Sequence, residues 1–481
     1  MGSRQFMNEN ISGLLSTAKD RLADKLSLFL TESSLDHRFI RLQVSIDGLD
    51  IIQWLRQQSF EIKTYWRDRE GKFEMAGLGE ADIISGSLMP DYHALFSRLK
   101  EYLGDTVEDV RYYGGMRFNR RHNSDFKWQA FTSYRFIVPK FELFRKGTET
   151  YFICNLLVHT GEEVSKIVET ALNELKEIQF NQAAQSHDFP KVTNRIDFPD
   201  FDGWKNNIEE ALTAFHETNL DKIVLARKTT LKFGESIDPI ELLWRLRLNN
   251  HRAYYFCFQP KKDVAFIGGT PEQLYCRHEN QIHTEAVAGT RKRGTTTNED
   301  IKFENDLLNC EKDIREHRFV VDSIRGALKK LCTNIIEQEK LSILKLSRLQ
   351  HLLMQFSGKI KDDVQDCDIL ENLHPTPAVG GVPSQKSISE IERIEQFDRG
   401  WYAGPVGWIG KDKAEFAVAI RSGLVHEDEL YLYSGAGIVE GSDSQSEWEE
   451  IETKISGFMN ALKEIDQPQT VKTDSGLHVT R

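Results

Sequence analysis

Apolar residues along the chain recur with two periods, one of two residues and one of three to four. The two-residue period, rich in β-branched and aromatic side chains, predicts strands in the first part of the chain. These runs are FIRLQVSI, KTYW, VRYYGG, YRFIVPKFELF and YFICNLLV. The longer period predicts helices at 11–30 and in VSKIVETALNELKEI. The polar stretch that follows, NQAAQSHDFPKVTNRIDFPD, is the predicted linker.

The second part of the chain mixes strands with long helices. It opens with a predicted helix at 201–218, and longer helices are predicted around 303–332 and 446–463. The predicted strands are KIVLARKTTLKF, AYYFCFQP, VAFIGG, EFAVAI and LYLYSGAGIV. Strict strand–helix–strand alternation is absent from this order, which disfavours a Rossmann-type sheet. We therefore expect an α+β fold in which antiparallel sheets pack against helices.

Composition restricts the kind of protein and its partners. The chain has 481 residues, of which 40% are hydrophobic and 28% charged, so it is long enough for one large domain or for two to three ordinary ones. Its net charge of -12 disfavours nucleic acid or an anionic membrane as the main partner. An anionic small molecule stays possible, because a site can concentrate positive charge locally.

The cysteines and the apolar runs indicate a cytoplasmic protein. None of the six cysteines lies in a CxxC pair, so we expect reduced, buried thiols. No apolar run reaches the roughly 18 residues of a membrane-spanning helix. The start of the chain, MGSRQFMNENISGLL, also lacks the apolar core of a signal peptide.

The stretch LLNCEKDIREHRFVV, residues 307–321, is predicted to be helical although it carries many charges. At 100° per residue, Asp313 and Glu316 lie together on one flank of the apolar stripe, and His317 lies within the stripe. Such flank carboxylates are usually solvated. A histidine in an apolar stripe is more often a hydrogen-bonded core residue than a ligand.

The last helix, SEWEEIETKISGFMNAL, has a similar flank that carries Glu447, Glu450 and Lys454. A structural reading is available, because Ser444 and Glu447 fit a capping box and Glu450 and Lys454 fit an i,i+4 ion pair. If the two acidic helices meet across a cleft, their carboxylates suit Mg²⁺. Sequence spacing does not show that they meet, and it shows no His/Cys cluster with zinc spacing.

Three further positions could carry chemistry. Lys222 begins an apolar strand, where a lysine is either solvated or, with a lowered pKa, a base. Glu272 follows the sequence GGTP and is either an acid of raised pKa or a carboxylate at the start of a helix. Gly289, in AVAGT, allows close approach of the backbone to a ligand.

Taken together, these segments resemble the chorismate-utilising enzymes, the family of anthranilate, aminodeoxychorismate, salicylate and isochorismate synthases. The resemblance covers about 201–462. It rests on eight motifs in the family's order: KIVLARK, GGTPEQL, AVAGTRKRG, EKDIREH, HPTPAVGG, FDRGWYAGPVGW, AIRSG and GAGIVEGSDSQSEWEE. Before residue 200 the runs YW, AGLG, RYYGGMRF and VPKFEL look like those of the longer, menaquinone-type isochorismate synthases.

The resemblance implies the anthranilate synthase component I fold, with large antiparallel β-sheets in a sandwich flanked by helices. We expect an N-terminal part at 1–195, packed into the same sandwich as a catalytic, chorismate-binding domain at 196–465. A polar tail at 466–481 is expected to be disordered.

Within the family, the motifs resemble the isochorismate branch. The resemblance makes Lys222 the general base and Glu272 the general acid, with Thr270 where the family usually has serine. Ala288 stands where the aminodeoxychorismate branch carries its lysine nucleophile. Ala378, in HPTPAVGG, is typical of the isochorismate branch and is counted with the substrate-binding residues.

The resemblance also implies a metal site and further substrate contacts. It assigns Mg²⁺ to Glu316 and Glu450, with Asp313 and Glu447 orienting metal-bound waters. A dicarboxylate substrate would be held by positive charge and by backbone N–H groups. The implied contacts are Gly289, His351, Arg421, Gly435 and Lys454, with Tyr402 as a weaker candidate.

The expected function is that of an isomerase, a Mg²⁺-dependent isochorismate synthase that converts chorismate to isochorismate for menaquinone biosynthesis. Alternatives are a siderophore-pathway isochorismate synthase, a salicylate synthase, and a non-catalytic chorismate-binding subunit. Chorismate is the expected partner. We expect no glutaminase subunit, because water rather than ammonia attacks the ring, and a monomer or homodimer.

Overall fold

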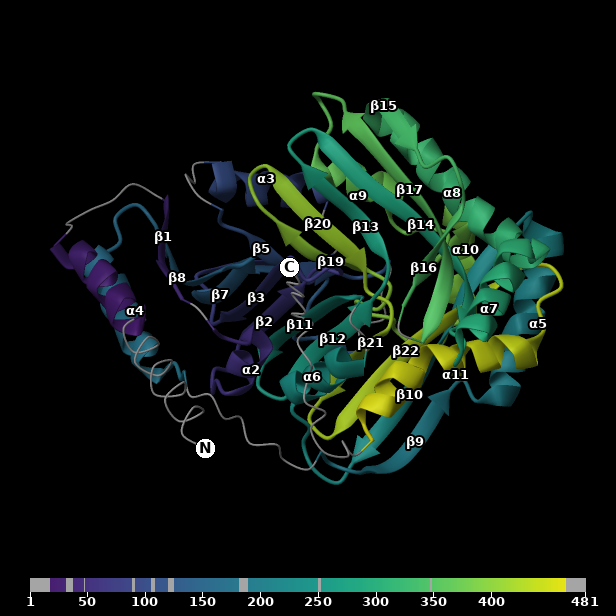
Figure 1. The fold of residues 1–481 in the computed structure, drawn as a ribbon, viewed down its shortest axis with the longest axis horizontal. Helices are drawn as coiled ribbons and strands as arrows, with labels where there is room; N and C mark the ends of the chain where they lie inside the picture. The colour runs from purple at the N-terminus through teal and green to yellow at the C-terminus, as the bar shows by residue number, and fades with distance from the viewer. Residues whose placement is uncertain are drawn as a thin grey trace, which may run out of the picture.

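A computed structural model of the chain describes residues 18–31, 38–46, 48–88, 91–104, 109–119, 125–180, 189–249, 252–346 and 348–463. These residues form two large antiparallel sheets flanked by helices (Figure 1). The helix predicted at 11–30 is helical at 18–27, the part of it that is described before the 3₁₀ turn η1 (Leu28–Thr31). The predicted tail at 466–481 lies outside the described residues.

The larger sheet has twelve strands in the order β1-β8-β7-β3-β2-β11-β12-β21-β22-β10-β18, with β9 paired to β10. Its strands come from both sides of residue 195. They are β1 (Arg38–Ser45), β2 (Lys63–Arg67), β3 (Phe73–Leu78), β7 (Phe141–Lys146), β8 (Glu149–Val158), β9 (Val192–Phe198), β10 (Lys222–Phe233), β11 (Tyr254–Lys261), β12 (Val264–Thr270), β18 (Gly381–Val382), β21 (Ser422–His426) and β22 (Glu429–Ile438).

The smaller sheet has ten strands in the order β15-β17-β14-β13-β20-β19-β5-β6-β4, with β16 paired to β17. It also takes strands from both parts of the chain. They are β4 (Asp82–Gly86), β5 (Tyr112–Met116), β6 (Tyr134–Val138), β13 (Gln273–His278), β14 (Gln281–Lys292), β15 (Cys332–Glu337), β16 (Ser342–Lys345), β17 (Leu349–Ile360), β19 (Pro405–Ile409) and β20 (Lys413–Val418).

Helices cover the outer faces and the ends of the sheets. They are α2 (Ile51–Arg56), α3 (Tyr92–Gly104), α4 (Val164–Glu177), α5 (Phe201–Thr218), α6 (Pro239–Asn249), α7 (Thr297–Asn309), α8 (Glu311–Leu331), α9 (Asp366–Leu373), α10 (Ser384–Ile394) and α11 (Ser444–Ala461), with a 3₁₀ turn η2 (Phe126–Trp128). Figure 1 shows α8 beside β14 and α11 beside β22, and both helices contact those strands. Among the described residues, no helix is long and apolar enough to cross a membrane.

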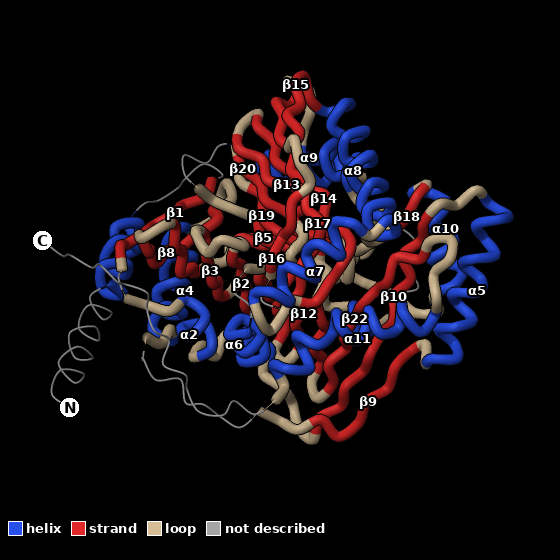
Figure 2. Tube along the Cα trace, turned by 45° about the vertical axis from the view of Figure 1, so that its right-hand side comes forward, coloured by secondary structure: helices blue, strands red, loops and turns tan. Residues whose placement is uncertain are grey.

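Two apolar clusters account for most of the core. One joins the facing sides of the two sheets and includes Trp66, Phe256, Phe266 and Trp401, all fully buried. The other lies on the opposite face of the larger sheet, where α2, α4, α6 and α11 pack (Figure 2). Because β2, β3 and β8 share these clusters with β11, β12 and β22, the first part of the chain completes the sheet that carries the later motifs.

Two predicted elements differ from the structure. The predicted linker contains β9, which pairs with β10 from Lys228 to Phe233, while its residues 181–188 lie outside the described ranges. The helix predicted around 303–332 is broken at Cys310, whose extended backbone (ψ 110°) ends α7 and precedes α8. Periodicity missed this break because apolar residues continue on both sides of it.

Candidate active site

A cavity lies where the two sheets, α8 and α11 come together. The described residues that line it come from six strands or helices and the turns between them. They are Val224, Pro271, Glu272, Val287, Ala288, Gly289, Thr290, Glu316, His351, Ala378, Val379, Tyr402, Ile420, Arg421, Ser434, Gly435, Glu450 and Lys454. The cavity therefore gathers nine of the predicted site residues, which are spread over more than 180 positions of sequence.

Lys222 lies at the start of β10, behind this cavity. The chain reverses after α5 at Asn219, which adopts a left-handed conformation (φ 52°), and β10 begins three residues later. The Lys222 side chain is fully buried, and its Nζ donates to Oε1 of Glu316 at 2.9 Å. It passes close to Gly437 of β22, where an added Cβ would lie 3.1 Å from Lys222 Cε. The lysine is thus an internal group of the site and not a solvated strand end.

Glu272 lies in the turn between β12 and β13. Its backbone carbonyl accepts from Val418 N at 3.1 Å, and its backbone N–H donates to the Thr270 hydroxyl at 3.3 Å. The Thr270 hydroxyl in turn donates to Val418 O at 2.7 Å. Threonine at this position therefore supplies a hydroxyl that bonds the turn, as a serine could. The two glycines that precede it, Gly268 and Gly269, are part of β12 and do not form a turn.

Burial raises the pKa of the Glu272 carboxyl to about 8. The Thr376 hydroxyl, which donates to Oε1 at 3.2 Å, opposes this rise, while the charge of Glu285 adds to it. Lys222 and Lys454 also oppose it through their positive charges. The carboxyl is therefore protonated at neutral pH, which is the state that a general acid requires.

Two carboxylates from different helices line the same cavity. Glu316 of α8 pairs with Lys222, and Glu450 of α11 pairs with Lys454 across 2.6 Å. Burial alone would raise the pKa of Glu450, but the Lys454 ammonium brings it below its usual value. Both side chains are hard oxygen donors, and each already lies next to a cation. This donor set fits Mg²⁺, which prefers one or two carboxylates and substrate oxygens.

The two flanking carboxylates are held by neighbouring cations. Asp313 accepts from Arg291 Nη2 at 2.7 Å. Glu447 accepts from Lys312 Nζ at 3.0 Å and from the Ser442 hydroxyl at 2.8 Å. Neither Asp313 nor Glu447 is among the described residues that line the cavity, so both lie behind the residues that do.

Two cations line the side of the cavity next to α11. Lys454 Nζ donates to Gly435 O at 2.8 Å, and Arg421 Nη1 donates to Lys454 O at 3.3 Å. Burial lowers the pKa of Arg421 to about 10, so it stays charged at neutral pH. Arg421 has a positive φ of 51°, a conformation that a non-glycine residue holds only where the surroundings enforce it. The site thus offers an anion the guanidinium of Arg421, which can donate two parallel hydrogen bonds, and the ammonium of Lys454.

His351 faces the cavity as a neutral ring. Its Nδ1 lies 2.9 Å from Gly289 O, a carbonyl that can only accept, so Nδ1 carries the proton. Burial lowers the pKa of His351 to about 3. Its Nε2 is buried with no partner among the described residues, which leaves one acceptor available to a substrate hydroxyl. Gly289 has φ +67°, and a Cβ there would meet Asp313 at 3.2 Å. His317, by contrast, is a buried core residue whose Nε2 lies 3.1 Å from Ala286 O.

A buried ion pair supports the strand that carries Lys222. Between its pairings with β18 and β9, the edge of β10 has no strand neighbour among the described residues. Arg399 donates to Val224 O at 2.7 Å, and Glu395 accepts from Ala226 N at 2.7 Å. Arg399 also donates to Val379 O at 3.0 Å. The pair thus takes the place of a strand and ties β10 to the loop that lines the cavity.

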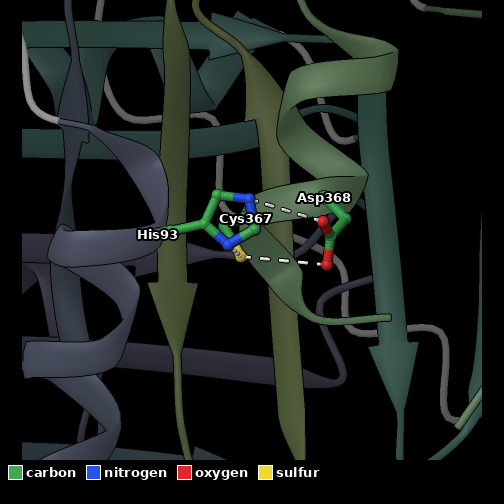
Figure 3. Close-up of side chains that lie close together, drawn as sticks. All are labelled: His93, Cys367 and Asp368. Atoms are coloured by element: carbon green, nitrogen blue, oxygen red, sulfur yellow. Dashed lines mark hydrogen bonds and ion pairs between the residues drawn. The ribbon is translucent and has the colours of Figure 1, made fainter. Parts of the chain in front are cut away.

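A second cluster of polar side chains joins α3 to α9, away from this cavity (Figure 3). His93 Nδ1 lies 3.3 Å from the Cys367 sulfur, and His93 Nε2 lies 3.6 Å from Asp368 Oδ1. Asp368 also caps its own helix by accepting from Gln365 N at 2.7 Å. Because each ring nitrogen faces a different partner, the cluster is explained as a hydrogen-bonded contact between the helices. Sequence spacing did not reveal it, since 274 positions separate His93 from Cys367.

Three residues at the site carried little signal in the sequence. Thr376, which bonds Glu272, lies in an irregular loop where neither period applies. Thr290 lies 3.2 Å from His351 Nδ1, and Tyr402 stacks on Tyr433 with ring centroids 5.4 Å apart. Only their presence inside the AVAGT, HPTPAVGG and GWYAGPVGW motifs marked them.

The chain matches the family described as chorismate binding enzymes over residues 25–463. This span is most of the chain, so the protein belongs to that family. Isochorismate synthase 2 of Arabidopsis thaliana, a chloroplastic enzyme, is 35% identical over 398 residues, which cover 81% of this chain and 70% of the relative.

Two solved structures share the fold. MenF, described as the menaquinone-specific isochorismate synthase of Escherichia coli, superposes with a TM-score of 0.83 at 27% identity, covering 93% of this chain and 100% of that one. Anthranilate synthase component I of Streptococcus pneumoniae TIGR4 superposes with a TM-score of 0.58 at 17% identity, covering 89% and 93%. The predicted fold class is confirmed.

Proposed function

We propose that this protein is an isochorismate synthase, an isomerase that interconverts chorismate and isochorismate. The observation that supports this most directly is one cavity lined by a buried, protonated Glu272 and by Glu316, which is paired with the fully buried Lys222 behind the cavity wall. Membership of the chorismate binding family and the likeness to two isochorismate synthases supply the substrate class.

The dicarboxylate substrate would be held by the cations of the cavity. Arg421 would bind one carboxylate through two N–H groups, and the Lys454 ammonium would add a positive charge beside it. The backbone N–H groups of Gly289 and Gly435 and the free Nε2 of His351 complete the polar contacts, and Ala378 lines the wall. Each of these groups lies at the cavity lining, so the ring would be fixed in one orientation.

The reaction adds water at C2 and removes the hydroxyl at C4. Lys222, as the neutral amine in its working state, accepts a proton from the attacking water and becomes the ammonium. Glu272 donates a proton to the departing hydroxyl, so one water enters and one leaves. Base and acid act on opposite sides of the ring. They come from separate segments, the start of β10 and the β12–β13 turn. Each proton-transfer partner typically contributes ~10²–10⁴-fold in rate.

Glu316 and Glu450 would hold Mg²⁺, with Asp313 and Glu447 one layer out. When bound, the ion would polarise the ring carboxylate and favour attack at C2. The chain's own residues bind the substrate and move both protons.

We place the enzyme in menaquinone biosynthesis in the cytoplasm. This is supported by the similarity to Escherichia coli MenF, which extends over 93% of the chain and therefore includes its first part. Water as the nucleophile removes the need for a glutaminase subunit. A division at residue 195 is compatible with one shared sandwich, because both sheets contain strands from each side of it.

The test is turnover of chorismate by purified protein with Mg²⁺, in an assay coupled to isochorismatase. We expect isochorismate as the chromatographic product, and losses of ~10²–10⁴-fold for Lys222→Ala and for Glu272→Gln. Lys228→Ala, on the same strand but packed against Phe198 and Phe397, is the matched control and should keep full turnover. Salicylate plus pyruvate would identify a salicylate synthase instead. Chorismate bound but unchanged would identify a non-catalytic subunit.

A further inference from the structure

The turn that carries Glu272 is held by two other side chains, neither of which is among the described residues that line the cavity. Arg69 comes from the turn between β2 and β3 and donates through Nη1 to Pro271 O at 2.9 Å. Glu285 of β14 accepts from Gln273 N at 3.1 Å. One backbone group on each side of Glu272 is therefore bound by one of these two residues.

Arg69 and Glu285 also bind each other. Arg69 Nη1 and Nη2 donate to the two carboxylate oxygens of Glu285 at 2.5 and 2.8 Å. Their side chains are 12% and 2% exposed. A bidentate pair fixes both partners in orientation as well as in distance. The Arg69 guanidinium further lies over the Tyr254 ring, 5.5 Å from its centroid. The side chains of Arg69 and Glu285 are therefore each fixed by several contacts.

We propose that Arg69 and Glu285 form a positioning pair, which holds the turn from Pro271 to Gln273 so that the Glu272 carboxyl faces the substrate. The proposal rests on the proposed function, since that function makes Glu272 the acid. Among the described residues, the lining of the substrate cavity includes neither partner. The pair acts through the turn, and it connects a residue of the first part of the chain to the proposed acid.

The pair also sets the charge next to the acid. The titratable or hydrogen-bonding groups that face Glu272 from the surrounding elements are Glu285 of β14, Lys222 of β10, Lys454 of α11, Tyr402 and Thr376. Of these groups, Glu285 carries the negative charge, and this charge raises the pKa of Glu272. Arg69 offsets that charge directly. Removing Arg69 should therefore raise the pKa of Glu272 further, and removing the charge of Glu285 should lower it.

The experiment measures kcat, KM and the alkaline limb of the pH profile for Arg69→Gln, Glu285→Gln and the double variant. A displaced acid should lower kcat by up to ~10²-fold with KM nearly unchanged, because Arg421 and Lys454 still bind the substrate. The alkaline limb should move to higher pH in Arg69→Gln and to lower pH in Glu285→Gln. In the double variant the limb should return toward its original position while kcat stays low.

Two further variants separate positioning from a loss of folding. Arg69→Lys keeps the positive charge but loses the bidentate hydrogen bonds. The alkaline limb of the pH profile should therefore stay in place, while kcat should recover only in part. Glu70→Gln removes an exposed charge from the same turn and should change neither quantity. Limbs that stay fixed, or that shift in the same direction in the two single variants, would overturn the proposal. If Glu272→Gln itself kept full turnover, the proposed function would fail instead.

Discussion

Lys222 Nζ lies 2.9 Å from Oε1 of Glu316, so the proposed base and one proposed metal ligand form an ion pair inside the site. The pair joins β10 of the larger sheet to α8, which packs on the smaller one. Glu450 and Lys454 form a second such pair within α11. The two carboxylates proposed to bind Mg²⁺ are thus each paired with a lysine that has its own proposed role in the reaction.

Glu316→Gln and Glu450→Gln should each weaken Mg²⁺ activation by more than ~100-fold. A neutral amide is a poorer ligand than a carboxylate, and even residues outside the ligand shell affect metal affinity by ~10–100-fold. The measurement is a titration of activity and of binding heat with Mg²⁺. Glu449→Gln, exposed on the same helix and bonded to Gln445, should match the parent protein. Unchanged Mg²⁺ activation in either of the first two variants would rule out the ligand assignment.

The activity should fall as pH rises through about 8. The raised pKa of Glu272 keeps its carboxyl protonated at neutral pH, and the protonated form is the one that donates to the leaving hydroxyl. Above this pKa the acid is ionised and the rate falls. The measurement is the pH profile of kcat/KM, which reports the free enzyme.

Thr376→Val should move this alkaline limb to higher pH by up to about one unit. The Thr376 hydroxyl donates to Oε1 of Glu272 and so lowers the pKa of that carboxyl, and valine removes the donor at nearly the same volume. Thr290→Val, a similar change at the cavity wall next to His351, should leave the limb in place. A limb that moves to lower pH in Thr376→Val would contradict the assigned hydrogen bond.

Gly437→Ala should lower kcat by up to ~10²-fold without unfolding the protein. An added Cβ would lie 2.6 Å from Glu316 Oε1 and 3.1 Å from Lys222 Cε, and it would push the base away from its working position. Gly326→Ala is the matched control, since a Cβ there meets nothing within 4 Å. In its exposed helical position, alanine should stabilise the protein by about 0.4–1 kcal/mol and leave kcat unchanged.

Arg399→Met should destabilise the protein by about 3–5 kcal/mol, because it leaves the Glu395 carboxylate buried without its partner. The same change also removes the donors to Val224 O and Val379 O. Arg393→Met, which breaks a half-exposed i,i+3 pair with Glu390 and an exposed pair with Glu210, should cost about 0–1 kcal/mol. The shift in the urea midpoint measures both. Equal shifts for the two variants would show that Arg399 does not support the edge of β10.

Local patterns predicted much of the fold. The period of two identified β10 at its observed bounds, and the helical period identified α5 at 201–218. The family motifs pointed to Glu272, Glu316, Arg421 and Glu450, all of which line one cavity. These features depend on local sequence, so they can be predicted from the sequence alone.

Other features depend on residues that are distant in sequence. The break at Cys310 interrupts an apolar stripe that looks continuous, and β9 forms in a polar stretch because β10 offers it an edge. The grip of Arg69 on the Glu272 turn spans 202 positions. No periodicity or composition could indicate it.

The sequence by itself thus determined most of the segments that form strands and helices and pointed to the side chains proposed to carry the chemistry, because alternation and motif spacing are local properties. Only the tertiary structure decided how acid, base and carboxylates are charged and oriented. Burial, hydrogen bonds and ion pairs set pKa values and rotamers, and these arise where distant segments pack together.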